Sequence, residues 1–217
     1  MDVGIIGGTG PAGRGLGLRL AAAGVSVGIG SRDPARAAEA VEGMRARWGP
    51  RLSGPIVGCG NAEAAGAGIV VLATPWEGAV QTVEALAAPL SGKVLVSMAN
   101  ALVREGGEML PLFHPRGSVA AAVQAVLPRT RVSAAFHHLP AREMGDLDSG
   151  LIADVLVCAD DPEATTETMS LVERVDGLRP LDAGSLAQAA AIEAFTSVCV
   201  TLNIRHRAHS TLKLAGI

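Results

Sequence analysis

The sequence VGIIGGTGPAG, residues 3–13, is the most informative stretch of this chain of 217 residues. A short aliphatic run leads directly into Gly8, Thr9, Gly10 and Gly13, spaced as GxGxxG, and a helical pattern follows. In a strand–turn–helix unit the first glycine permits a tight turn. The second lets the backbone approach a pyrophosphate, and the third lets helix and strand pack closely. The amides at the helix N-terminus then face the anion, so the stretch predicts a dinucleotide-binding site.

The end of the next aliphatic run, residues 25–29, indicates which dinucleotide is bound. A site for NAD carries Asp or Glu there, to accept hydrogen bonds from the ribose 2′-hydroxyl. This chain has Ser31 and Arg32 instead, with Arg36 one helical turn further on. Two cations near the positive end of a helix are unfavourable unless an anion lies between them, and a 2′-phosphate is such an anion. These residues therefore predict NADP(H).

Aliphatic runs and helical patterns alternate through the first part of the chain, which is typical of βαβ units on a parallel sheet. The expected strands are 3–6, 25–29, 69–73 and 94–97, and the expected helices are 16–23, 34–48, 76–88 and 118–127. Residues 49–60 form a Gly/Pro-rich stretch that is expected to be a connection only. Further strands are expected at 131–135, 155–158 and 178–181, a helix at 162–175, and a long apolar, buried helix within 185–208.

This pattern predicts an α/β fold with a Rossmann-type doubly wound parallel sheet and a small C-terminal α/β domain. Residues 1–135 form the expected NADP-binding domain, and residues 136–217 the smaller domain that closes a crevice. In such a sheet the loops at the carboxyl ends of the strands line the ligand crevice. We therefore expect Thr74, Pro75 and Trp76, which follow the run 69–73, to contact the cofactor. Trp76 is equally well explained as an anchor for its own helix.

The composition argues against several classes of function. A net charge of −3 and an aromatic content of 2% are unlike a nucleic-acid-binding protein, which needs clustered positive charge and stacking platforms. Three widely separated cysteines describe neither a disulfide framework nor a metal site. The N-terminus lacks the charge and apolar length of a signal peptide, and the longest apolar stretch, 187–204, is interrupted by Glu193 and Asn203. We expect a cytoplasmic protein without membrane or nucleic-acid partners.

Six strings along the chain resemble one family, the NADPH-dependent reductases of coenzyme F420, a deazaflavin. They are GGTG (7–10) with Gly13, GSRD (30–33), TPWE (74–77), AFHHLPA (135–141), VCADD (157–161) and DGLRPLDAG (176–184). The resemblance covers nearly the whole chain, and the last string is far more specific than a dinucleotide fingerprint. It implies reversible hydride transfer between NADP(H) and coenzyme F420, with the deazaflavin stacked on the nicotinamide between the two domains.

The resemblance also implies roles for individual residues. By position, Thr9, Ser31, Arg32 and Arg36 match cofactor-binding sites of the family, the last three around the 2′-phosphate. His137 and Leu139 match the segment that lies against the deazaflavin ring, and His138 stands where a small Thr is common. Because hydride passes directly between the two cofactors, no catalytic acid or base is expected. His137 is a candidate stabiliser of negative charge on the reduced deazaflavin.

Other interpretations of the sequence differ in class. A reductase of imines or β-hydroxy acids shares the opening strand, glycine loop and helix. Such families add a long helical domain, however, for which residues 136–217 leave too little chain. A soluble NADPH-dependent flavin reductase and a non-enzymatic NADP-binding sensor or regulatory protein both stay open. The apolar segment 185–208 is expected to pack on the first domain or on a partner, and a homodimer is the expected assembly because C2 pairing is the commonest.

Overall fold

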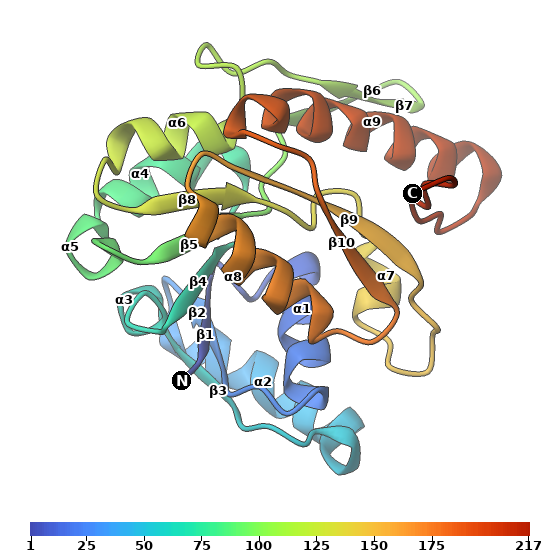
Figure 1. Ribbon diagram of the computed structural model, residues 1–217. Coiled ribbons are helices and arrows are strands. Elements are labelled where there is room, and N and C mark those ends of the chain that lie inside the picture. The colour runs from blue at the N-terminus through green and yellow to red at the C-terminus, as the bar shows by residue number, and fades with distance from the viewer.

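The computed structural model describes all residues 1–217, and an eight-stranded sheet forms its centre (Figure 1). Its strands are β1 (Val3–Ile6), β2 (Val27–Ser31), β3 (Ile56–Gly60), β4 (Ile69–Leu72), β5 (Val94–Ser97), β8 (Arg131–Ala134), β9 (Ala153–Ala159) and β10 (Leu178–Asp182). They lie in the order β10-β9-β8-β5-β4-β1-β2-β3. All neighbours pair in parallel except β8 and β9. The order from β3 to β8 is the doubly wound arrangement, which confirms the predicted α/β Rossmann-type fold.

Helices cover both faces of this sheet. They are α1 (Pro11–Ala22), α2 (Pro34–Trp48), α3 (Asn61–Ala64), α4 (Ala79–Glu84), α5 (Ala87–Leu90), α6 (Val119–Val126), α7 (Ala141–Met144), α8 (Pro162–Glu173) and α9 (Ala189–His206). Short 3₁₀ turns occupy Gly49–Arg51, Trp76–Gly78 and Leu186–Gln188. One buried cluster of 32 residues includes side chains of α1, α2 and α8. A second cluster, of 20 residues, includes side chains of α4, α6 and the start of α9.

Local sequence explains how the helices beside the site begin. Asp33 is the N-cap of α2, its carboxylate accepts a 3.0 Å hydrogen bond from the Ala35 amide, and Pro34 takes the first helical position. This confirms the expected start of that helix. Ser118 caps α6 in the same way, accepting a 2.9 Å bond from the amide of Ala121.

Several elements of the structure differ from the prediction. Residues 56–60, expected as part of a connection, form the edge strand β3, in which glycines hid the apolar pattern. A Cβ at Gly58 would lie 2.4 Å from the carbonyl carbon of Ala37, so glycine is what lets α2 pack on this strand. The expected helix 76–88 is divided into a 3₁₀ turn, α4 and α5. The hairpin of β6 (Leu102–Glu105) and β7 (Glu108–Pro111) was not expected at all.

The expectation of a buried C-terminal helix is wrong for much of its length. Figure 1 shows α9 running beside the β6–β7 hairpin along one edge of the molecule. Its apolar side chains Phe195, Val198 and Leu202 are 39%, 49% and 45% exposed. The stretch Leu186–His206 is long and apolar enough to cross a membrane, with a mean hydropathy of 1.3, and a third of it is buried. Glu193 belongs to the buried third of this stretch, where its carboxylate accepts hydrogen bonds from the amides of Val119 and Ala120.

The chain beyond residue 135 continues the same sheet. β9 pairs antiparallel with β8, and β10 pairs parallel with β9. The expected boundary therefore falls directly after β8, where Phe136 turns the chain out of the sheet with a φ of 65°. The division into domains 1–135 and 136–217 stays a prediction.

Candidate cofactor-binding site

The carboxyl ends of β1 and β4 meet at the point where the strand order reverses, which is where open α/β sheets bind ligands. Gly7, directly after β1, has a φ of 71°. A Cβ on Gly7 would lie 2.7 Å from Cγ2 of Thr74, so the loops after the two strands are in close contact. The tight turn predicted at Gly8 is thus made by Gly7, which is the one glycine of this loop with a positive φ.

At the other glycines of the fingerprint, the space around the missing side chain differs from one position to the next. A Cβ at Gly13 would lie 2.8 Å from Cα of Gly8, and one at Gly8 would lie 2.9 Å from the carbonyl oxygen of Ile5. These two residues are therefore required by packing. A Cβ at Gly10 would meet nothing closer than 3.8 Å. Gly10 is also the N-cap of α1 and supplies no side-chain cap, which leaves open space and free amides suited to an anion.

Asn61 supports the glycine loop from a distance. Its Oδ1 accepts a 3.1 Å hydrogen bond from the Gly7 amide. Asn61 is the first residue of α3, and its side chain points at the loop rather than capping its own helix. No sequence signal identifies this contact, because it depends on the pairing of β1, β2 and β3.

Ser31, Arg32 and Arg36 come together where β2 ends and α2 begins. The Oγ of Ser31 accepts a 3.1 Å bond from the amide of Asp33, so its hydroxyl proton is free to donate to another group. Both arginines are exposed and make no ion pair. The structure therefore offers three donors in one region, as a 2′-phosphate site requires, with Asp33 engaged in capping α2.

A second group of polar side chains lies at the ends of β4, β5 and β8. Four of their polar atoms are buried and have no hydrogen-bond partner in the protein: Oγ1 of Thr74, Oδ1 of Asn100 and both ring nitrogens of His137. The amide nitrogen of Asn100 donates to the backbone oxygen of His137 at 3.1 Å, which joins two of the three. Each buried polar group without a partner costs about 1–3 kcal/mol. Their concentration at one edge of the sheet indicates a site for polar ligands.

His137 is neutral in this environment. Burial lowers its pKa to about 3, and the neighbouring His138 adds to the shift. The ring is 4% exposed, so it donates at most one N–H and carries no charge at physiological pH. Leu139 is 7% exposed and gives an apolar surface beside it. Pro75 is exposed, whereas Trp76 is half-buried and packs on the second core cluster.

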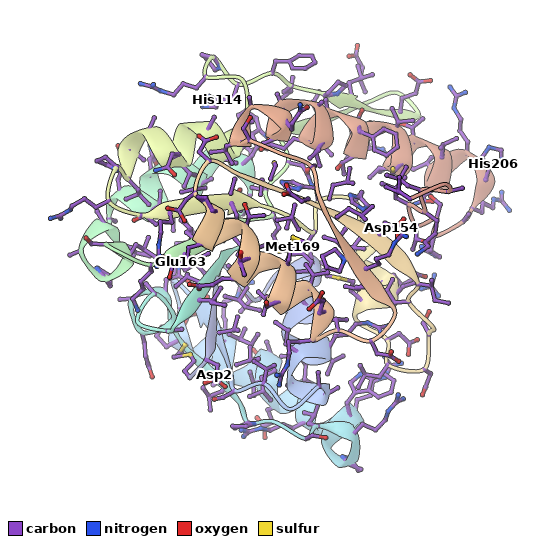
Figure 2. The ribbon with its side chains drawn as sticks, in the orientation of Figure 1. Asp2, His114, Asp154, Glu163, Met169 and His206 are labelled. Atoms are coloured by element: carbon purple, nitrogen blue, oxygen red, sulfur yellow. The ribbon has the colours of Figure 1, made fainter.

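His138 belongs to a brace rather than to an open pocket. Its Nε2 lies 2.7 Å from the backbone oxygen of Asp154, a fully buried residue of β9 labelled in Figure 2. The Asp154 carboxylate accepts bonds from Nε and Nη2 of Arg179 at 2.8 and 2.7 Å, from Nζ of Lys213 at 2.6 Å and from the amide of Leu214 at 2.6 Å. These donors hold the pKa of Asp154 well below its usual range. The brace fixes the end of the chain beside the residues that follow β8.

A glycine-rich loop at the switch point of a doubly wound sheet defines a Rossmann-type protein of the dinucleotide-binding class. The chain belongs to the F420-dependent NADP reductase family. Residues 2–101 match the family model described as NADP oxidoreductase coenzyme F420-dependent.

Relatives resemble this chain from end to end. The F420-dependent NADP reductase of Methanocaldococcus jannaschii is 37% identical over 97% of this chain and 96% of its own length. The reductase of the same description from Methanothermobacter marburgensis is 32% identical over 100% of this chain and 97% of its own length. A crystal structure of a protein from Arthrobacter sp. fb24, described as a putative F420-dependent NADP reductase, superposes with a TM-score of 0.81. It is 28% identical, and 99% of each chain is covered.

Proposed function

We propose that this protein transfers a hydride reversibly between NADP(H) and the deazaflavin coenzyme F420. The observation that carries this conclusion is full-length similarity to reductases of that description. The structure adds two suitable regions at one edge of the sheet, the open glycine loop and the unpartnered polar groups near His137.

The residues divide between the two cofactors. The cofactor-binding set is Gly8, Thr9, Gly10, Gly13, Ser31, Arg32, Arg36, Thr74, Pro75 and Trp76 for NADP(H), and His137 and Leu139 for the deazaflavin. When bound, the nicotinamide and deazaflavin rings supply the hydride chemistry themselves. The chain orients the rings and excludes water, and holding reactants about 3–3.5 Å apart recovers roughly 7–11 kcal/mol of a barrier. Neutral His137 stabilises charge on the reduced deazaflavin through one N–H, and no residue acts as a catalytic acid or base.

An absorbance assay tests this function. Purified protein mixed with NADPH and oxidised F420 should bleach the visible band of the deazaflavin, and NADH or a flavin acceptor should give much slower reaction. Bleaching of a flavin but not of F420 would favour a soluble flavin reductase. Tight NADPH binding without turnover of any acceptor would favour a sensor or regulatory protein. Either result would overturn the proposal.

We propose that the protein forms a homodimer and that it is located in the cytoplasm. The exposed apolar side chains of α9 lie beside a groove of about 540 Å³ between α9 and β7, and Phe113 near the hairpin is 72% exposed. Apolar surface gathered in this way is typical of a protein interface. A second copy of this chain, related by a two-fold axis, would cover it. Light scattering should give twice the monomer mass, and Leu202→Arg should give the monomer mass.

A further inference from the structure

A groove of about 710 Å³ lies between α1, α2 and α7 and begins at Thr9 of the phosphate loop. Four arginines line it, Arg14, Arg36, Arg47 and Arg142, and Glu39 is the one acid among its lining residues. The function proposed above uses only the end of this groove, where Thr9 and Arg36 lie. The rest is a positively charged channel without an assigned ligand.

The floor of this arginine groove is apolar and leaves room for a ligand. It includes Leu18, Met44 and Trp48, and the guanidinium of Arg47 lies 4.5 Å from the Trp48 ring centroid. Arg47 also lies 3.8 Å from the Asp146 carboxylate, but the two side chains are 63% and 39% exposed, so solvent screens the pair and it is weak. A Cβ on Gly43, in the middle of α2, would have no atom within 4 Å. The groove is thus open at a helix position that usually carries a side chain.

The wall formed by α7 is held in a fixed position. A Cβ at Gly15 would lie 2.7 Å from Cβ of Met144, so glycine lets α7 pack against α1. Nη2 of Arg19 donates to the backbone oxygens of Glu143, Asp146 and Ser149 at 2.6, 2.9 and 2.9 Å. These contacts keep Arg142 at the rim of the groove.

The chain itself connects this wall to the deazaflavin region. His137 and Leu139 lie at the end of β8, and α7, which carries Arg142, begins two residues after Leu139. Arg47 lies 11 residues beyond Arg36, which at 1.5 Å per residue is about 16 Å along α2. The groove therefore extends well past the 2′-phosphate region. Its length and charge suit an extended polyanion, and Ala141 and Arg142 line it close in the chain to His137 and Leu139.

We propose that the arginine groove binds the anionic tail of the deazaflavin coenzyme, meaning the phosphodiester and carboxylates attached to its ribityl chain. This inference rests on the proposed function, because it needs the deazaflavin ring at His137 and Leu139. The arginines attract the phosphate and carboxylates, and the apolar floor carries the atoms between them.

Gly43 gives a test that leaves the folded structure intact. Gly43→Glu places an acid in the groove, and Gly43→Gln places a side chain of the same size without charge. Each variant replaces a mid-helix glycine in open space, so neither should destabilise α2. The readout is the equilibrium Kd of oxidised F420, and of the tail-free deazaflavin that ends at the ribityl group, both from ligand fluorescence. The Kd of NADPH is measured as a control.

We expect Gly43→Glu to weaken F420 binding roughly 3- to 10-fold relative to Gly43→Gln, as for one or two partly screened charge contacts. Arg142→Gln should act in the same direction. The Kd values of the tail-free deazaflavin and NADPH should be unchanged by these substitutions. Of the two deazaflavins, only F420 should bind markedly more weakly as the salt concentration rises. Equal effects on both deazaflavins, equal effects of Glu and Gln, or a change confined to NADPH would overturn the inference. The proposed function is tested separately, by reduction of the tail-free deazaflavin with NADPH, which should proceed in the wild-type protein and in every variant. If the wild-type protein reduces neither deazaflavin, the proposed function is wrong, whatever the Kd values show.

Discussion

The backbone amide of Gly7 donates a 3.1 Å hydrogen bond to Oδ1 of Asn61, although 54 residues separate them in the chain. This bond links the turn after β1, whose positive φ only glycine adopts easily, to the first turn of α3. The phosphate loop is therefore positioned by the protein before any ligand binds. Such preorganisation reduces the entropic cost of binding.

Asn61→Leu removes this acceptor at nearly constant side-chain size and leaves the Gly7 amide without a partner. The lost bond costs about 1–3 kcal/mol, which corresponds to roughly a 5- to 150-fold rise in the Kd of NADPH. Titration calorimetry with NADPH measures the change. The Kd of F420 serves as control, and an unaltered NADPH Kd would show that the loop holds its shape without Asn61.

Arg32→Ser combined with Arg36→Ala should abolish the preference for NADPH over NADH. Charge-assisted hydrogen bonds contribute about 1.5–3 kcal/mol each, so loss of either arginine alone gives roughly a 10- to 150-fold rise in the KM for NADPH, and loss of both gives a larger rise. The KM for NADH should stay nearly constant, because NADH has no 2′-phosphate. Steady-state kinetics with both cofactors decide the matter. A parallel rise in both KM values would place the arginines at another part of the dinucleotide.

His137→Ala should weaken F420 binding or turnover and leave the Kd of NADPH unchanged. Because burial lowers the pKa of His137 to about 3, the ring stays neutral from pH 5 to 9. The rate in wild-type protein should therefore show no break from this residue in that interval, and His137→Gln should give a profile of the same shape. Unchanged kinetics in the alanine variant would remove His137 from the site.

Glu193 makes stability depend on pH. Burial raises its pKa to about 7 from an ordinary value of 4.5, and this outweighs the bonds that it accepts from the amides of Val119 and Ala120. Because the pKa of Glu193 is higher in the folded than in the unfolded protein, its protonation adds to the free energy of unfolding. This contribution is fully present below pH 4.5 and is lost as the pH rises through 7. At roughly 1.4 kcal/mol per unit, the loss is a few kcal/mol at most.

Thermal melts of wild type and Glu193→Gln at pH 5.5 and 8 check this. The Tm of wild type should fall between the two pH values by more than that of the glutamine variant, whose amide cannot ionise. Equal changes in Tm for the two proteins would mean that Glu193 keeps an ordinary pKa.

Asp154→Asn should loosen the C-terminal tail and the residues beside His138. The change leaves Arg179 and Lys213 without their buried counter-ion. Breaking fully buried pairs costs about 3–5 kcal/mol, and we expect roughly 2–3 kcal/mol here because both cations reach solvent. Urea unfolding measures the loss, and hydrogen exchange should rise at residues 211–217. Unchanged exchange in the tail would contradict its attachment through Asp154.

The sequence alone predicts the parts of this molecule that depend on local pattern. Glycine spacing, together with the alternation of aliphatic runs and helical patterns, identifies the doubly wound sheet and the dinucleotide loop. β3 is not predictable in the same way, because Gly58 and Gly60 interrupt its apolar pattern. The contacts of Asn61 with Gly7 and of Lys213 with Asp154 join residues more than 50 positions apart. Only the strand order brings such side chains together.

Transfer of deuterium from NADPH labelled at both positions of nicotinamide C4 shows whether the hydride passes directly from one cofactor to the other. In a single turnover with oxidised F420, we expect one deuterium per reduced deazaflavin by mass spectrometry, in ordinary water and at every pH from 6 to 8. Reduced deazaflavin that carries hydrogen from solvent instead would contradict direct transfer between two cofactors held at this edge of the sheet.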